Sequence, residues 1–271
     1  MKKQLPLGLV LEGSSTHSPV LRLPRLAEDL GPIKSSAVRI ARRFSNLIQG
    51  GYPVASYEEL QSARLVLLRI PDPAVERVVS ELCSSGLAMN RICFLLCETW
   101  LTSEVLAPLK ERGAAVASLV RAPATERDYF IVEGQLSAAR LARRFVEGHD
   151  GRAFEIKVAS KHLFFAAEVL TTVLPLSLLS AAQKSLRAAG LAGNELAALL
   201  ESMAQKMVRE ASHGIRLPLS NLPADCPPAL AAQFMSQLQL EEPRLASFLE
   251  QRLDASGKLI DEAWKNATAG D

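Results

Sequence analysis

Short apolar runs bounded by turn-forming residues recur through the first half of the chain. In the clearest of them, residues 65–70, branched aliphatic residues predominate until the run stops at Pro71. A strand that is apolar on both faces is typical of a parallel sheet covered by helices on both sides. Similar runs predict further strands at residues 7–11, 32–36, 91–97, 115–119 and 129–132.

Segments with helical period lie between these predicted strands. After Pro71, apolar residues recur at positions 75, 78, 79 and 82, which is the spacing of an amphipathic helix. Helical segments are also predicted up to Leu30, over residues 38–48, from Thr102 or Ser103 through Lys110, and over residues 137–146. Pro19 and Pro24 make the first of these start late or irregularly. Strands that alternate with helices indicate the α/β class, with a doubly wound parallel sheet.

The pattern changes to helices alone from Ser160 onward. Helices are predicted at residues 161–189 with a kink at Pro175, and at 194–212, 228–238, 242–253 and 256–265. We therefore predict two domains, an α/β domain over residues 1–153 and an all-helical domain over residues 154–271. The first long helix carries a broad apolar surface, which suits either a homodimer formed through the helical domain or a buried helix of a monomer.

The amino-acid composition limits the kinds of partner that the chain is expected to bind. Lys and Arg total 31 against 29 for Asp and Glu, so the net charge of +2 gives no electrostatic case for nucleic acid or a membrane surface. The four cysteines show no CxxC spacing and only four histidines are present, which argues against a metal site or a disulfide framework. Residues 1–6 do not have the pattern of an export signal, and the apolar stretch 169–182 is short and interrupted by Pro175. We expect a cytoplasmic protein that binds neither nucleic acid nor membranes.

Ligands of doubly wound sheets bind beyond the carboxyl ends of the strands. Pro71 and Asp72, which follow the predicted strand at residues 65–70, are therefore placed where a substrate or cofactor would bind.

Four segments together resemble a known family: residues 65–72, 113–119, 130–134 and 161–170. Their order and spacing are similar to those of bacterial proteins that pair a Rossmann-like domain with a C-terminal helical domain of unassigned function. More widely, they resemble the NAD(P)-binding superfamily of pyrroline-5-carboxylate reductase and 6-phosphogluconate dehydrogenase. The resemblance implies an NAD(P)-dependent oxidoreductase, a dehydrogenase or an imine or carbonyl reductase, that acts on a small molecule.

The glycine fingerprint of this superfamily is degenerate in the chain. Aligned on the family, its glycine positions hold Leu11, Gly13 and Thr16, so only the middle glycine remains. The resemblance implies that Gly13, Ser14, Ser15 and Thr16 bind the cofactor. The hydroxyls and amides of Ser14, Ser15 and Thr16 are still suited to a phosphate at a helix start, although Pro19 removes one amide. Two hypotheses stay open: an oxidoreductase that binds a dinucleotide, and a non-catalytic Rossmann-scaffold dimer or ligand sensor that has lost that binding.

The second predicted strand ends in a cationic, hydroxyl-rich corner. Lys34, Ser35 and Ser36, with Arg39 nearby, stand where NAD enzymes usually carry an acid, and such a corner suits the 2′-phosphate of NADP. Alternatively, Arg39 belongs to the solvated face of a helix. The resemblance also implies that Lys161 acts as an acid toward a reacting carbonyl, and the alternative is an ordinary surface lysine.

Overall fold

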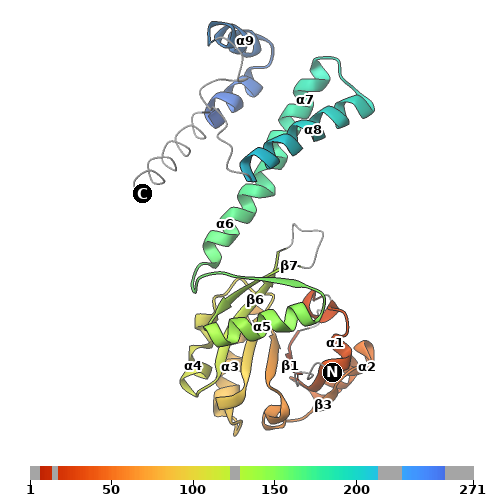
Figure 1. The fold of residues 1–271 in the computed structure, drawn as a ribbon, viewed down its shortest axis with the longest axis vertical. Helices are drawn as coiled ribbons and strands as arrows, with labels where there is room; N and C mark the ends of the chain where they lie inside the picture. Colours follow the sequence, from red (N-terminus) through yellow and green to blue (C-terminus); the bar gives the residue numbers. More distant parts are fainter. Residues whose placement is uncertain (1–6, 14–17, 123–128, 213–227, 254–271) are drawn as a thin grey trace. The chain divides into compact units, whose positions relative to one another are not determined.

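The computed structural model describes residues 7–13, 18–122, 129–212 and 228–253 (Figure 1). The chain divides into two compact units, Met1–Thr172 and Val173–Asp271, which we describe separately.

The first unit is built on an eight-stranded sheet. Its strands are β1 (Leu7–Leu11), β2 (Leu30–Ser35), β3 (Tyr52–Val54), β4 (Leu65–Arg69), β5 (Cys93–Cys97), β6 (Ala115–Arg121), β7 (Tyr129–Gly134) and β8 (Arg152–Glu155). The strand order is β3-β2-β1-β4-β5-β6-β7-β8, and neighbouring strands are parallel except β6 and β7. The chain order reverses between β1 and β4, which makes their carboxyl ends the topological switch point. The prediction of a doubly wound α/β sheet is confirmed.

The two strands that the sequence pattern did not predict, β3 and β8, are the edges of the sheet. The short strand β3 contains Pro53, which an edge strand tolerates because one side of its backbone has no partner strand. In β8 only Ala153 is buried, so the strand has no apolar run. Because β8 extends beyond residue 153, the predicted domain boundary cuts through a strand, and the compact units instead divide after Thr172.

Helices cover both faces of the sheet. Side chains from α1 (Leu26–Asp29), α2 (Val38–Ile48) and α5 (Leu136–Gly148) join one apolar cluster, and those from α3 (Val75–Ser84) and α4 (Ala107–Glu111) join the other. Leu67 and Leu68 belong to opposite clusters and both are fully buried, as expected for a strand covered on both sides. Short 3₁₀ turns complete the connections: η1 (Val20–Arg22), η2 (Glu58–Ser62), η3 (Asp72–Ala74), η4 (Met89–Arg91) and η5 (Ser103–Leu106).

The segment between β1 and β2 is irregular, as Pro19 and Pro24 predict. It holds the three-residue turn η1 and the four-residue helix α1, with Arg25 between them in a left-handed conformation. Pro19 and Pro24 lack the N–H that a continuous helix needs, and their rings clash with the preceding turn. The long helix that usually follows the first strand of this fold is therefore reduced to two short pieces.

A run of helices follows β8. The first unit ends in α6 (Lys161–Thr171), and the second contains α7 (Val173–Ala188), α8 (Gly193–Ser212), α9 (Pro228–Glu241) and a helix over residues 243–253. The break at Thr172 replaces the predicted kink, because Pro175 has no N–H to donate to the carbonyl of Thr171. The predicted helix at 256–265 lies outside the described residues.

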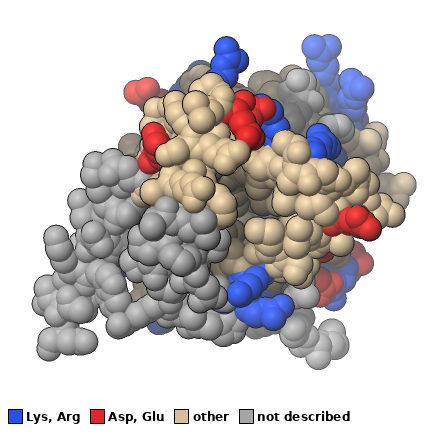
Figure 2. Space-filling model, turned by 90° about the horizontal axis from the view of Figure 1, so that it is seen from above, with Lys and Arg blue, Asp and Glu red and all other residues tan. Residues whose placement is uncertain are grey.

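Many apolar side chains of these helices are exposed. No residue of α7 is buried, and uncharged residues make up most of the described face seen in Figure 2. By length and composition alone, the stretch Lys161–Ala188 is long and apolar enough to cross a membrane, because it contains an 18-residue window with a mean hydropathy of 1.8. The apolar stretch is thus longer than the sequence analysis allowed.

Candidate functional site

The carboxyl ends of β2, β1 and β4 form a row at the switch point. Leu11 is in register with Ser35 on one side and with Arg69 on the other. Gly13 follows β1 with φ of +84°, and a Cβ atom built on it lies 3.4 Å from Cγ of Pro71. The structure therefore brings Gly13 and Pro71, two predicted site residues, into one corner.

Asp72 and Lys161 meet at the same edge through the loop that follows β5. Thr99 Oγ1 donates a hydrogen bond to Asp72 Oδ1 (2.6 Å), and Lys161 Nζ donates to the carbonyl oxygens of Thr99 (2.8 Å) and Leu101 (2.6 Å). Lys161 is 1% exposed, so it is not the surface lysine of the alternative interpretation. Burial lowers the pKa of Lys161 to about 8. The negative charges of Glu133 and Asp72 raise this pKa, but their effect is smaller than that of burial.

Glu133 of β7 is a buried carboxylate with several hydrogen-bond donors around it. It accepts hydrogen bonds from the Ser103 amide (2.9 Å), the Ser103 hydroxyl (3.1 Å), the Ser118 hydroxyl (2.9 Å) and the Ala159 amide (2.9 Å). Burial alone raises the pKa of Glu133, but these hydrogen bonds outweigh it and the pKa is lowered. Glu133 thereby joins η5, β6 and the turn before α6. An acid within an apolar strand was the available signal, because buried charges are normally paired.

Glu98 makes a second unpredicted contact, directly at the switch point. Its Oε1 accepts hydrogen bonds from the Ser18 hydroxyl and the Val20 amide (2.8 Å), and its Oε2 lies 2.9 Å from Nε of Arg69. Glu98 follows β5 and has φ of +58°, in the left-handed region. The side chain thus connects the ends of β5 and β4 to the segment after β1.

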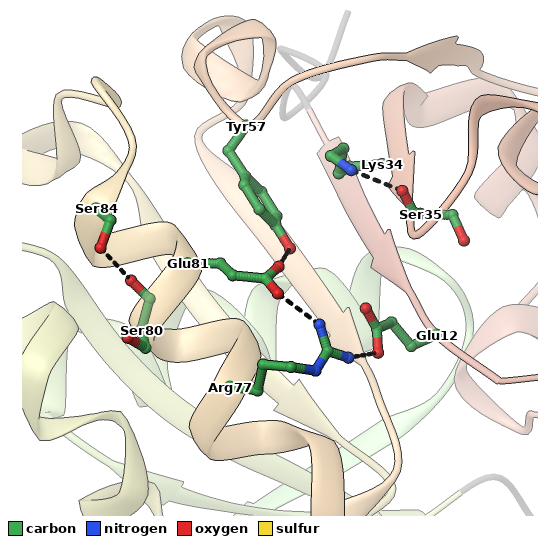
Figure 3. A network of polar contacts seen from close by, with 8 residues as sticks. All are labelled: Glu12, Lys34, Ser35, Tyr57, Arg77, Ser80, Glu81 and Ser84. Atoms are coloured by element: carbon green, nitrogen blue, oxygen red, sulfur yellow. Dashed lines mark hydrogen bonds and ion pairs between the residues drawn. The ribbon is translucent and has the colours of Figure 1, made fainter.

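A polar network holds the opposite side of this edge (Figure 3). Arg77 of α3 pairs with Glu12, next to Gly13, and with Glu81, whose other oxygen accepts a hydrogen bond from the Tyr57 hydroxyl (2.8 Å). Burial, with the adjacent Glu81 carboxylate, raises the pKa of Tyr57. Lys34 Nζ donates to the carbonyl of Ser35 (2.6 Å) and lies 4.9 Å from the centre of the Tyr57 ring. The negative charge of Glu12, next to Gly13, is therefore compensated by Arg77.

Other predicted site residues are placed differently. Ser36 and Arg39 are exposed at the beginning of α2. Ser14, Ser15 and Thr16 lie outside the described residues. A surface hollow of about 470 Å³ lies between α5 and β8, away from the switch point.

Two buried polar atoms at this edge have no hydrogen-bond partner among the described residues. They are Oγ of Ser35 and Nε of Arg69, whose N–H is not aligned with the nearby Glu98 carboxylate. Cys97 lies at the same edge, but burial raises its pKa well above the usual value, so its thiol is not a ready nucleophile. The site accordingly offers hydrogen-bond donors rather than a nucleophile.

Comparison with solved structures identifies the class to which this fold belongs. The chain is similar to a pyrroline-5-carboxylate reductase from Coxiella burnetii (11% identity, TM-score 0.55, 96% of this chain and 98% of that one). It is also similar to an imine reductase variant from Myxococcus stipitatus in complex with NAD⁺ (11% identity, TM-score 0.63, 95% of each chain). A protein from Thermotoga maritima matches with 21% identity, a TM-score of 0.56, and 96% and 98% coverage. The chain thus has the Rossmann-like fold of these solved structures, as the resemblance implied.

The family comparison concerns the second half of the chain. Residues 128–215 match the family described as "Domain of unknown function (DUF2520)". This match agrees with the predicted resemblance to Rossmann-like proteins that carry a helical domain of unassigned function. A search of curated proteins gave no match.

Proposed function

We propose that the chain is an NADP-dependent oxidoreductase that reduces the carbonyl or imine group of a small molecule. The observation that carries the proposal is the buried Oγ of Ser35, which has no hydrogen-bond partner among the described residues and belongs to the residue in register with Leu11. Buried polar atoms are rarely left without a partner, so this hydroxyl is a candidate to meet a ligand. Ser35 lies at the switch point, where doubly wound proteins bind dinucleotides.

The residues present suit the two ends of a dinucleotide. Ser35, Ser36 and Arg39 are proposed to hold the adenosine ribose and its 2′-phosphate, since a guanidinium and hydroxyls suit a phosphate. Gly13 to Thr16 are proposed to approach the pyrophosphate, and Pro71 and Asp72 to lie beside the nicotinamide. When bound, the dinucleotide supplies the hydride.

Lys161 is the proposed proton donor. Reduction of a carbonyl or imine needs a proton at the heteroatom, and a lysine with a pKa of about 8 is protonated at neutral pH yet releases a proton more easily than an ordinary lysine. Its ammonium has three N–H groups, and two of them are bound by the carbonyls of Thr99 and Leu101. Thr99 also binds Asp72, so the loop after β5 connects the proton donor to the crevice.

Calorimetric titration of the full chain with NADPH and with NADH tests the proposal. We expect saturable binding of NADPH and weaker binding of NADH. Arg39→Ala should weaken NADPH binding about tenfold, the effect of losing one phosphate contact, and leave NADH binding unchanged. Arg43→Ala, which removes an exposed arginine one turn further along α2, is the matched control. An absence of saturable NADPH binding at millimolar concentration would exclude the proposal.

A second candidate is a non-catalytic dimer or ligand sensor that has lost dinucleotide binding. It is favoured by the reduction of the first helix to η1 and α1, which do not offer a pyrophosphate the aligned amides and dipole of a long helix. Under this alternative, neither dinucleotide raises the melting temperature of the chain. Stabilisation by NADPH would contradict it.

A further inference from the structure

Glu98 occupies the position at the switch point that an anionic ligand would approach. The residue belongs to the end of β5, yet its carboxylate contacts Ser18, after β1, and Arg69, the last residue of β4. Those contacts bring one carboxylate over the carboxyl ends of adjacent strands. Glu98 itself is largely buried, with 11% of its side chain exposed.

The groups around this carboxylate are those that bind anions. Arg69 provides a guanidinium, and Ser18, which is completely buried, provides a hydroxyl. Arginine and hydroxyl groups form charge-assisted hydrogen bonds with carboxylates and with phosphates alike. The negative charges nearby have other partners, because Glu12 pairs with Arg77 and Asp72 accepts a hydrogen bond from Thr99.

The contact between Glu98 and Arg69 is also imperfect. Although Arg69 Nε lies 2.9 Å from Glu98 Oε2, its buried N–H makes no aligned hydrogen bond. Replacing this carboxylate with the oxygens of a ligand therefore costs less than displacing a carboxylate with a fully formed hydrogen bond.

We propose that Arg69 and Ser18 form the anion-binding site of the crevice, which takes the phosphate groups of a nucleotide, and that Glu98 is a built-in competitor for it. The identity of the anion as a dinucleotide pyrophosphate rests on the proposed function. The site itself requires only a phosphate that displaces the Glu98 carboxylate from Arg69.

The experiment is calorimetry on the full chain with two probes, inorganic pyrophosphate and NADPH. Glu98→Gln removes the competing charge at nearly constant shape, and Glu98→Asn also shortens the side chain while suiting the left-handed backbone. Both variants should bind pyrophosphate at least about tenfold more tightly, because a competing charge-assisted contact is lost. Arg69→Met should weaken pyrophosphate binding by at least about tenfold in the wild-type and Glu98→Gln backgrounds.

Glu76→Gln is the matched control, because it makes the same change of charge on the exposed side of α3. Its pyrophosphate affinity should equal that of the wild type, and circular dichroism establishes that each variant is folded. Should Glu98→Gln and Glu98→Asn bind pyrophosphate no more tightly than the wild type, or should Arg69→Met bind it equally well, the inference is overturned. If one of the two Glu98 variants does not fold, the other Glu98 variant and Arg69→Met still test the inference.

The two probes separate this inference from the proposed function. If pyrophosphate binding tightens in the Glu98 variants but NADPH never saturates any of them, the anion site stands and the dinucleotide proposal fails. If NADPH binds the wild type and the Glu98 variants bind both probes no better, the dinucleotide proposal stands and the role of Glu98 fails.

Discussion

Two buried charged side chains, those of Lys161 and Glu133, bind the loop after β5. Lys161 binds the carbonyl oxygens of Thr99 and Leu101, and Glu133 binds the amide and hydroxyl of Ser103. The lysine meets only acceptors and the glutamate only donors, so each satisfies backbone groups that would otherwise be buried without partners. Trp100, between the two carbonyls, packs its ring against Phe164 and Phe165 of α6. Lys161 therefore positions this loop whether or not it donates a proton.

The lowered pKa of Lys161 predicts how stability depends on pH. In the unfolded chain this lysine titrates near its ordinary pKa of 10.5, and in the folded chain near 8. Between these values the unfolded state binds more protons, so this group makes the folded state more stable as pH rises from about 8 to about 10.5. The gain is of the order of 3 kcal/mol, from about 1.4 kcal/mol for each pKa unit.

Urea denaturation of the wild type and of Lys161→Met at pH 7.5, 8.5 and 9.5 measures this contribution. Burial raises the pKa of Cys93 and Cys97, which lowers stability in the same pH range, so the informative quantity is the difference between the two proteins. We expect the wild-type stability to rise relative to that of Lys161→Met as pH increases. A constant difference between the two proteins would contradict the burial of a charged Lys161.

At the scale of elements, Gly134 controls how β7 lies against β6. It has φ of +150°, and a Cβ atom built on it would lie 2.5 Å from Cα of Ala117 and 2.6 Å from the carbonyl oxygen of Val116. These are backbone atoms of the neighbouring strand, so relief requires the strands to move apart. Glu133, the adjacent residue, would move with them.

Gly134→Ala should therefore reduce the free energy of unfolding by about 3 kcal/mol or more, as expected for overpacking combined with backbone strain. Gly148→Ala is the control, because nothing lies within 4 Å of its built Cβ atom, and alanine is expected to favour the end of α5 by up to about 1 kcal/mol. Urea denaturation measures both changes. Equal stabilities for the two variants would contradict the close approach of β6 and β7.

The elements also show what periodicity predicts and what it misses. Strands β1, β4 and β5 were predictable because burial on both faces requires an unbroken apolar run, as in residues 65–69. Edge strands β3 and β8 need no such run and were missed. The helix before β2 was predicted from its apolar residues, but the two prolines decide its form.

For the site, sequence reasoning placed Gly13, Pro71 and Asp72 because their position follows from the ends of strands. It did not find the contact between Ser18 and Glu98, which joins residues 80 positions apart. Such a pair depends on tertiary geometry rather than on local pattern. A charged residue at the end of a buried strand, such as Arg69, indicates only that some partner exists.

At the scale of the molecule, α7 exposes several large apolar side chains. Val173 and Leu176, which are 60% and 65% exposed, lie three residues apart and so on one side of the helix. Exposed apolar surface of this kind is typical of interaction surfaces. We propose that α7 contacts a second copy of the chain.

Leu176→Glu should then convert a dimer into a monomer, because the new charge would be buried in an apolar interface without a partner. Leu47→Glu makes the same substitution at an exposed leucine of α2, outside α7, and should leave the dimer intact. Sedimentation equilibrium measures the dissociation constant of each variant.

Since α7 also belongs to a stretch apolar enough for a membrane, vesicle flotation of the wild type tests whether its apolar face contacts lipid rather than a second copy of the chain. A wild type that sediments as a monomer at about 100 μM contradicts dimerisation, because specific dimers form far below that concentration. Co-flotation with vesicles instead assigns the apolar face to lipid.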